Sequence, residues 1–194
     1  LIPGWLVPGI GEVGERSDTP TIAFRHTRGM TPTDALLDSW DRQCTIISNL
    51  TCALTPELLD AKPSDDGWTI AFHLCHLHST RRFWHMKANG LEAPVGTPLF
   101  TVTEDEWIPS NDLGAIGERL AESQTLVRDW VRAKIAENAQ QCGNYDHPVL
   151  YLQHMIWHEG WHAGLIMLAL RRAGHEPTEE WEDANVWDQW RLPG

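Results

Sequence analysis

The chain has 194 residues, of which 42% are hydrophobic and 22% charged, values ordinary for a single globular domain. The net charge of −12 argues against nucleic acid or an anionic membrane surface as a partner, because both bind basic patches. No apolar run approaches the roughly 20 residues of a membrane-spanning helix. The first residues are not basic residues followed by an apolar stretch, and they therefore do not resemble a secretory signal.

Residues 1–29 differ from the rest of the chain, since they are rich in Gly and Pro and show no helical periodicity. We expect them to form a flexible extension, followed by a domain over 30–194. Met30 stands directly before a strong helix start, which suggests that the natural protein begins there and that the preceding residues were added or translated from upstream. A native flexible arm is the alternative.

The first predicted helix begins at Thr31, a good capping residue, and Pro32 suits the first helical position. Asp34 stands at the third helical position, where its side chain can complete a capping box. Apolar residues then recur at steps of three and four until Thr55-Pro56, near which we expect the helix to end.

Three further segments have the same helical periodicity. They cover residues 68–88, from Ser110 or Asn111 to about Asn138, and from Asp146-His147-Pro148 to Gly174. No run of alternating polar and apolar residues indicates a strand. The sequence therefore predicts an all-α protein built as an up-down four-helix bundle. From about residue 175 an acidic tail with three Trp follows, and we expect it to lie over the bundle or over a partner subunit.

The four Cys and the eleven Trp suggest where the protein works and how it packs. Cys44, Cys52, Cys75 and Cys142 are far apart and form no C-x-x-C pair, which indicates a reduced, cytoplasmic protein. Eleven Trp indicate large aromatic contact surfaces, which we expect in the core or in a dimer interface.

The stretch "WHEGWHAGLI" places two imidazoles on one face of the fourth helix. An α-helix turns by 100° per residue, so His158 and His162 project side by side, and such a pair can bind one metal ion. His154 lies one turn earlier on the same face. A polar patch on the surface of the bundle is the alternative explanation.

The second helix also carries histidines. His73 and His76 point in similar directions, on a helix face that is otherwise mostly apolar. Burying a neutral imidazole without a hydrogen-bond partner or metal costs roughly 1–3 kcal/mol. A metal ion shared with the fourth helix would satisfy such a group. His78 and His85 point to the far side, where we expect them to be solvated.

Two motifs make the chain similar to the DinB superfamily of metal-binding four-helix proteins. One is Trp68 followed eight residues later by His76-Leu77, and the other is "HEGWHAGLI". The resemblance covers about Thr31 to Gly174 and implies a metal ion held by His76, His158 and His162. Leu165 stands where the family usually has Gln, which puts substrate handling in doubt more than metal binding. His73 and His154 are not family ligand positions, and we interpret them as supporting or pocket residues.

Three neutral imidazoles suit a divalent ion, with Zn or Ni favoured and Fe or Co also compatible. Three protein ligands leave a position open, where a water or a thiol would lose its proton more readily. The resemblance implies that a low-molecular-weight thiol can be a co-substrate, because some relatives are isomerases or S-transferases that use one.

Glu159 allows two further interpretations. It could reach the edge of the site as a general base, although we favour an ordinary helix-surface carboxylate. The H-E-x-x-H spacing also occurs in zinc peptidases, but Leu165 and Leu168 stand where the metzincin continuation needs Gly and His. Glu182 is the remaining candidate third ligand for a peptidase, and no strand pattern indicates the substrate-binding sheet that such an enzyme needs.

The sequence therefore predicts a metal-dependent enzyme that acts on a small molecule, by thiol transfer or isomerisation or by hydrolysis. A metal-loaded binding or stress-response module without turnover is an alternative, and a scaffold with a purely structural metal is another. The family resemblance also implies a homodimer.

Overall fold

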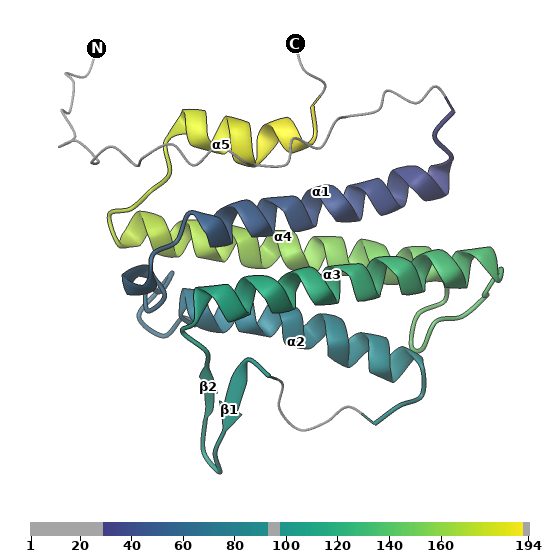
Figure 1. The fold of residues 1–194 in the computed structure, drawn as a ribbon, viewed down its shortest axis with the longest axis horizontal. Coiled ribbons are helices and arrows are strands. Elements are labelled where there is room, and N and C mark those ends of the chain that lie inside the picture. Colours follow the sequence, from purple (N-terminus) through teal and green to yellow (C-terminus); the bar gives the residue numbers. More distant parts are fainter. Residues whose placement is uncertain (1–28, 93–97, 192–194) are drawn as a thin grey trace. The chain divides into compact units, whose positions relative to one another are not determined.

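A computed structural model of the protein describes residues 29–92 and 98–191. The structure is mostly helical, and the four predicted helices are confirmed (Figure 1). They are α1 (Pro32–Cys52), α2 (Ile70–Ala88), α3 (Leu113–Ala136) and α4 (Pro148–Arg172), all within a compact unit, Thr31–Gly194. The predicted extension over 1–29 lies, apart from Gly29, outside the described residues. Within those residues no helix is both long enough and apolar enough to cross a membrane.

The four long helices pack lengthwise against one another (Figure 1). Helices α3 and α4 each contact both α1 and α2, and they also contact each other. A short 3-10 helix, Pro56–Leu58, follows α1 and leads into the loop before α2. Because α2 and α4 are in direct contact, histidines on their facing sides can meet.

Each long helix starts at a side-chain cap. Thr31 and Asp34 form the predicted capping box, with the Asp34 amide donating to Thr31 Oγ1 at 3.1 Å. Helix α2 is capped by Thr69 and α4 by His147, whose Nδ1 accepts from the Val149 amide. Helix α3 starts slightly later than predicted, because Asp112 caps it rather than Ser110 or Asn111.

The connection between α2 and α3 contains a small hairpin that the sequence analysis did not predict. Strands β1 (Phe100–Val102) and β2 (Trp107–Pro109) pair antiparallel, with Thr101 opposite Ile108. Strands of three residues are too short to show a recognisable alternation of polar and apolar side chains. The Phe100 ring anchors the hairpin, because it lies 5.0 Å from the Phe72 ring on α2.

The acidic tail forms α5 (Glu179–Asn185) and a 3-10 helix, Trp187–Gln189, both in contact with α1 (Figure 1). The amide of Asn49 on α1 donates to the Asn185 carbonyl at 3.0 Å. Trp181 and Val186 pack against buried apolar residues of the long helices. The tail thus lies on the outer side of α1.

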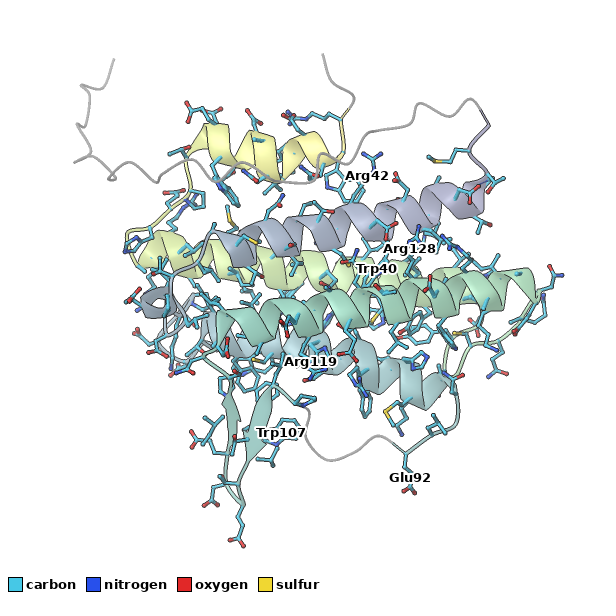
Figure 2. All side chains as sticks on the ribbon, in the orientation of Figure 1. Trp40, Arg42, Glu92, Trp107, Arg119 and Arg128 are labelled. Atoms are coloured by element: carbon cyan, nitrogen blue, oxygen red, sulfur yellow. The ribbon has the colours of Figure 1, made fainter. Side chains whose placement is uncertain are left out.

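The interior consists of two apolar clusters. One includes Leu50, Leu74 and Ile166, and the other includes Trp40 and Tyr151. Trp40 lies between α1 and α3, where its indole N–H donates to the Gln124 carbonyl at 3.1 Å (Figure 2). Charged and polar side chains are also buried in the described part of the chain, among them Arg81, Glu159 and three histidines.

Substitutions at two helical leucines, one buried and one exposed, test how much this packing stabilises the fold. We expect Leu50→Ala, at a side chain that is 1% exposed, to lower the free energy of unfolding by about 2–5 kcal/mol, because it leaves a cavity. Leu168→Ala is the matched control, since Leu168 is 45% exposed, and its cost should be below about 1 kcal/mol. Urea unfolding measures both values, and equal costs would contradict the described core.

Candidate metal centre

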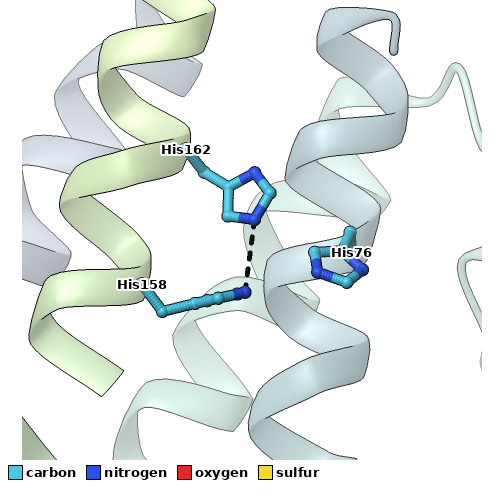
Figure 3. Close-up of side chains that lie close together, drawn as sticks. All are labelled: His76, His158 and His162. Atoms are coloured by element: carbon cyan, nitrogen blue, oxygen red, sulfur yellow. Dashed lines mark hydrogen bonds between the residues drawn. The ribbon is translucent and has the colours of Figure 1, made fainter. Parts of the chain in front are cut away.

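The structure brings together the three histidines that the family resemblance indicated. His76 on α2 and His158 and His162 on α4 each offer one ring nitrogen, and these atoms lie within 4.8 Å of one another. The Nε2 atoms of His158 and His162 are 3.2 Å apart. Figure 3 marks this contact with a dashed line and shows His76 beside it on the neighbouring helix. His162 is buried and the other two rings are half-buried. We call these three residues the histidine cluster, and its composition allows it to hold a metal ion.

Local helix geometry explains the cluster. His158 and His162 are one turn apart on α4, so their side chains point in similar directions. His76 reaches them from α2, and the Thr80 hydroxyl one turn later lies 3.1 Å from His76 Nε2, where it helps to hold the ring. Trp68 covers the cluster from the loop before α2, with its indole nearly parallel to the His162 ring at a centroid distance of 6.1 Å.

His73 supports the cluster from the same helix as His76. It is 2% exposed, and its Nδ1 lies 2.8 Å from Nδ1 of His162. His154 has a different place, because its Nδ1 is hydrogen-bonded to the Tyr145 hydroxyl at 2.6 Å. Its ring centroid is 6.4 Å from that of His158. Both residues therefore neighbour the cluster, and His73 touches it directly.

The expectation that His78 and His85 are solvated is wrong. His78 is fully buried, and its Nδ1 donates to the Arg119 carbonyl on α3 at 2.7 Å. His85 is half-buried against the Trp130 ring, at 5.5 Å between centroids. The far side of α2 faces α3 rather than water, and the helical periodicity of α2 alone cannot show this.

The imidazoles of the site are neutral at pH 7. Burial lowers the pKa of His73, His76 and His158 from 6.5 to about 4 and that of His162 to about 3. Repulsion between the rings adds to the effect, since His158, His76 and His73 all lower the pKa of His162. A neutral imidazole keeps a lone pair free, which is the form that binds metal ions.

These shifts make the stability of the metal-free protein depend on pH. The folded-state pKa values of about 3 to 4 lie below the unfolded value of 6.5, so the unfolded chain binds more protons between these limits. The contribution to stability is therefore complete above pH 6.5 and is lost as the pH falls towards 4. Urea unfolding at pH 7 and pH 5 should show this loss, and His162→Gln should reduce its pH dependence. A pH dependence unchanged by the substitution would contradict the burial of this ring.

The buried charge pair Arg81–Glu159 lies beside the cluster. Both side chains are 1% exposed, and the guanidinium donates from Nε and Nη2 to the two Glu159 oxygens, each at 2.8 Å. The remaining donors reach the Leu120 carbonyl at 2.8 Å, Ser123 Oγ at 3.3 Å and Cys44 Sγ at 3.6 Å. All five N–H groups of Arg81 thus have an acceptor. Burial alone lowers the pKa of Arg81, but the Glu159 carboxylate outweighs it and raises this pKa above its usual range.

The interpretation of Glu159 as a surface carboxylate is therefore wrong, and the structure does not support its role as a general base either. Both carboxylate oxygens are occupied by a guanidinium that is charged at any relevant pH. The peptidase interpretation loses the residue that made it attractive, because its H-E-x-x-H motif relies on a free Glu carboxylate. Sequence reasoning missed Arg81 altogether. Arg81 comes four residues after Leu77, so it lies on the same interior side of α2, and this position could have indicated a buried cation. A single arginine forms no repeating pattern, however, and the sequence does not show where its partner lies.

Removing one partner of this pair should be costly. We expect Glu159→Gln to lower the free energy of unfolding by about 3–5 kcal/mol, because it leaves the Arg81 charge buried without its counter-ion. The double substitution Arg81→Met, Glu159→Met removes both charges and should recover much of that loss. Glu122→Gln weakens exposed pairs with Arg82 and Arg119 and should cost below about 1 kcal/mol. Urea unfolding measures all three, and a cost for Glu159→Gln as small as that of the control would refute this account.

A recess of about 460 Å³ opens beside the cluster. His73, His158 and His162 form part of its wall, and the rest comes from the loop before α2 and from α4. The other lining residues are Pro63, Ser64, Asp66, Gly67, Trp68, Trp157, Trp161 and Leu165. The volume lies within the range of roughly 300–1,000 Å³ that small-molecule sites occupy. A molecule in this recess would lie against the imidazoles.

The fold and site define a helical protein with a cluster of three histidines shared between two helices and bordered by a small-molecule-sized recess. The family model of the DinB superfamily matches residues 36–166, more than half of the chain and all three cluster histidines. The chain therefore belongs to the DinB superfamily. Searches of curated proteins and of solved structures gave no significant match.

Proposed function

We propose that His76, His158 and His162 hold one divalent metal ion and that the protein is a metal-dependent enzyme acting on a small molecule. The observation that carries this proposal is the 3.2 Å separation of the two Nε2 atoms on α4, with a third imidazole from α2 beside them. Two nitrogens bound at ~2.05 Å to one tetrahedral ion are roughly 3.3 Å apart. The cluster is thus close to the spacing that a shared ion requires.

The chemistry of the donor set also fits such an ion. Burial and mutual repulsion lower the pKa of all three imidazoles to about 4 or below, so each has a lone pair at neutral pH. Imidazole ligands suit Zn or Ni, and also Fe or Co. Among the described residues, these three side chains are the one group of three or more His, Cys, Asp or Glu residues whose donor atoms could together hold an ion. Three protein ligands would leave a coordination position for a substrate or a water. When bound, the ion would supply Lewis-acid chemistry and lower the pKa of a water or thiol.

The residues around the cluster would fix how it binds. His162 presents Nε2 to His158 and Nδ1 to His73. If Nε2 is a metal ligand, its proton must be on Nδ1, which then donates to His73 Nδ1 at 2.8 Å. That places the proton of His73 on Nε2, which has no hydrogen-bond partner among the described residues. The contact with His73 is thus compatible with the tautomer of His162 that can bind metal.

Four packed helices with a metal site between two of them also support the finer fold assignment. We assign α1 to α4 to an up-down four-helix bundle of the DinB type, because α3 and α4 each lie against both α1 and α2. In this assignment the metal would link α2 to α4 from the side of the recess.

Two reactions are compatible with the site. A low-molecular-weight thiol could react as a co-substrate, or water could hydrolyse an ester, amide or lactone. An electrophile panel assayed with and without glutathione, bacillithiol or mycothiol distinguishes them. Turnover that needs a thiol supports transfer or isomerisation, and metal-dependent turnover without a thiol supports hydrolysis.

Metal analysis tests the assignment directly. Protein purified without a His-tag should contain about one divalent ion per chain, and His76→Ala should lose most of it, because two imidazoles on one helix bind metal more weakly than three. His175→Ala is the matched control, since His175 is exposed and lies beyond α4. Elemental analysis by mass spectrometry gives both values.

The same variants separate catalysis from the alternatives. Metal content unaffected by His76→Ala would remove this residue from the site. Chelation that abolishes turnover while the fold survives supports an enzyme. Chelation that only lowers the melting temperature, with no turnover found before it, would indicate a structural metal instead.

A further inference from the structure

Three tryptophans surround the recess although indole rings are usually buried. Trp68 is 44% exposed, Trp157 62% and Trp161 58%. For a Trp side chain of ~250 Å², the last two alone leave roughly 300 Å² of ring surface in water. Exposed apolar patches of a few hundred Å² are often functional. The tryptophans therefore point to a ligand that covers them.

The rings line two sides of the recess. Trp157 and Trp161 are one turn apart on α4, with ring centroids 5.7 Å apart and planes inclined by 36°. Trp68 lies in the loop before α2, and the angle between its indole plane and the plane of the His162 ring is 5°. Broad π surfaces from two elements thus border one space, and flat rings are the groups that stack best on such surfaces.

The charges of the lining residues limit the ligand further. None of the described residues that line the recess is Lys or Arg, and Asp66 is their one carboxylate. An anionic substituent on the part of the ligand that lies away from the cluster would find no cationic side chain in the lining to pair with. A cationic ligand would meet repulsion from a divalent ion in the cluster. An uncharged ring avoids both costs.

We propose that the recess binds the flat, uncharged aromatic ring of a small molecule, stacked on Trp157 and Trp161, with a donor atom of the same molecule reaching the histidine cluster. Only the role of the donor atom rests on the proposed function. The ring site follows from the tryptophans themselves.

Three hydroxamic acids test the complete proposal, because they share one metal-binding head and differ in the attached group. Isothermal titration calorimetry of the zinc-loaded protein should show benzohydroxamate binding about tenfold more tightly than acetohydroxamate. Cyclohexanecarbohydroxamate has a similar apolar volume without a flat π face, and it should bind clearly more weakly than the benzene compound.

Matched variants test whether the preference for the aromatic hydroxamate comes from Trp157 and Trp161. The double substitution Trp157→Leu, Trp161→Leu should bring the three affinities to within about twofold of one another without changing the zinc content. Trp107→Leu is the control, since Trp107 is similarly exposed at 44% but lies on the hairpin strand β2 (Figure 2). It should leave the preference intact.

A metal-independent measurement keeps the ring site testable if zinc binding itself fails. Benzamide, added to the metal-free protein, should shift the indole N–H resonances of Trp157 and Trp161 in NMR spectra, and cyclohexanecarboxamide should not. Equal responses to flat and non-flat compounds, in either experiment, would overturn the proposal. So would the absence of any response together with a change from dimer to monomer in the double variant, because a second copy of the chain would then cover these rings. Loss of zinc binding alone would overturn only the proposed function.

Discussion

The buried contact between Arg81 and Glu159, with the other acceptors of Arg81, connects all four long helices. The guanidinium extends from α2, the carboxylate from α4, and the remaining acceptors are Cys44 on α1 and Leu120 and Ser123 on α3. A bidentate pair tolerates little change in distance or angle, and its charges cannot move into an apolar cluster without a large penalty. Apolar side chains alone allow helices to slide or rotate at lower cost. This contact therefore restricts the register of α2 against α4 more than apolar packing alone would.

The same register produces the histidine cluster. Glu159 lies between His158 and His162 in sequence but points about 100° away from His158, towards the interior. When Arg81 holds Glu159 inside, the two histidines must face the side where His76 arrives from α2. The H-E-x-x-H pattern in this chain is thus a structural anchor flanked by two imidazoles. In a peptidase the Glu of that pattern acts on substrate, so identical spacing serves a different purpose here.

The sequence alone predicted the features that depend on local patterning. The capping box at Thr31 and Asp34 follows from residue types at fixed spacing, and so does the pairing of His158 with His162. The imidazoles on the apolar face of α2 suggested a metal shared with α4, but the choice of His76 as the ligand needed the family resemblance, because helical spacing within α2 says nothing about its neighbour. The same limit explains the errors at His78 and Glu159, whose partners lie 41 and 78 residues away. Long-range polar contacts have no periodic signal, and the three-residue strands are too short to give one.

The exposure of the cluster bears on whether a metal there would be structural or reactive. Structural zinc sites are closed by four protein ligands, whereas reactive sites keep a position open. Here the described residues supply three imidazoles, and two of these rings border a recess with room for a small molecule. Burial is deep enough to keep the rings neutral, yet His76 and His158 remain only half-buried. A site that served stability alone would gain from closing this side with apolar side chains. Instead the chain keeps large indole rings at the opening, and this arrangement favours binding of a molecule next to an ion held by the cluster.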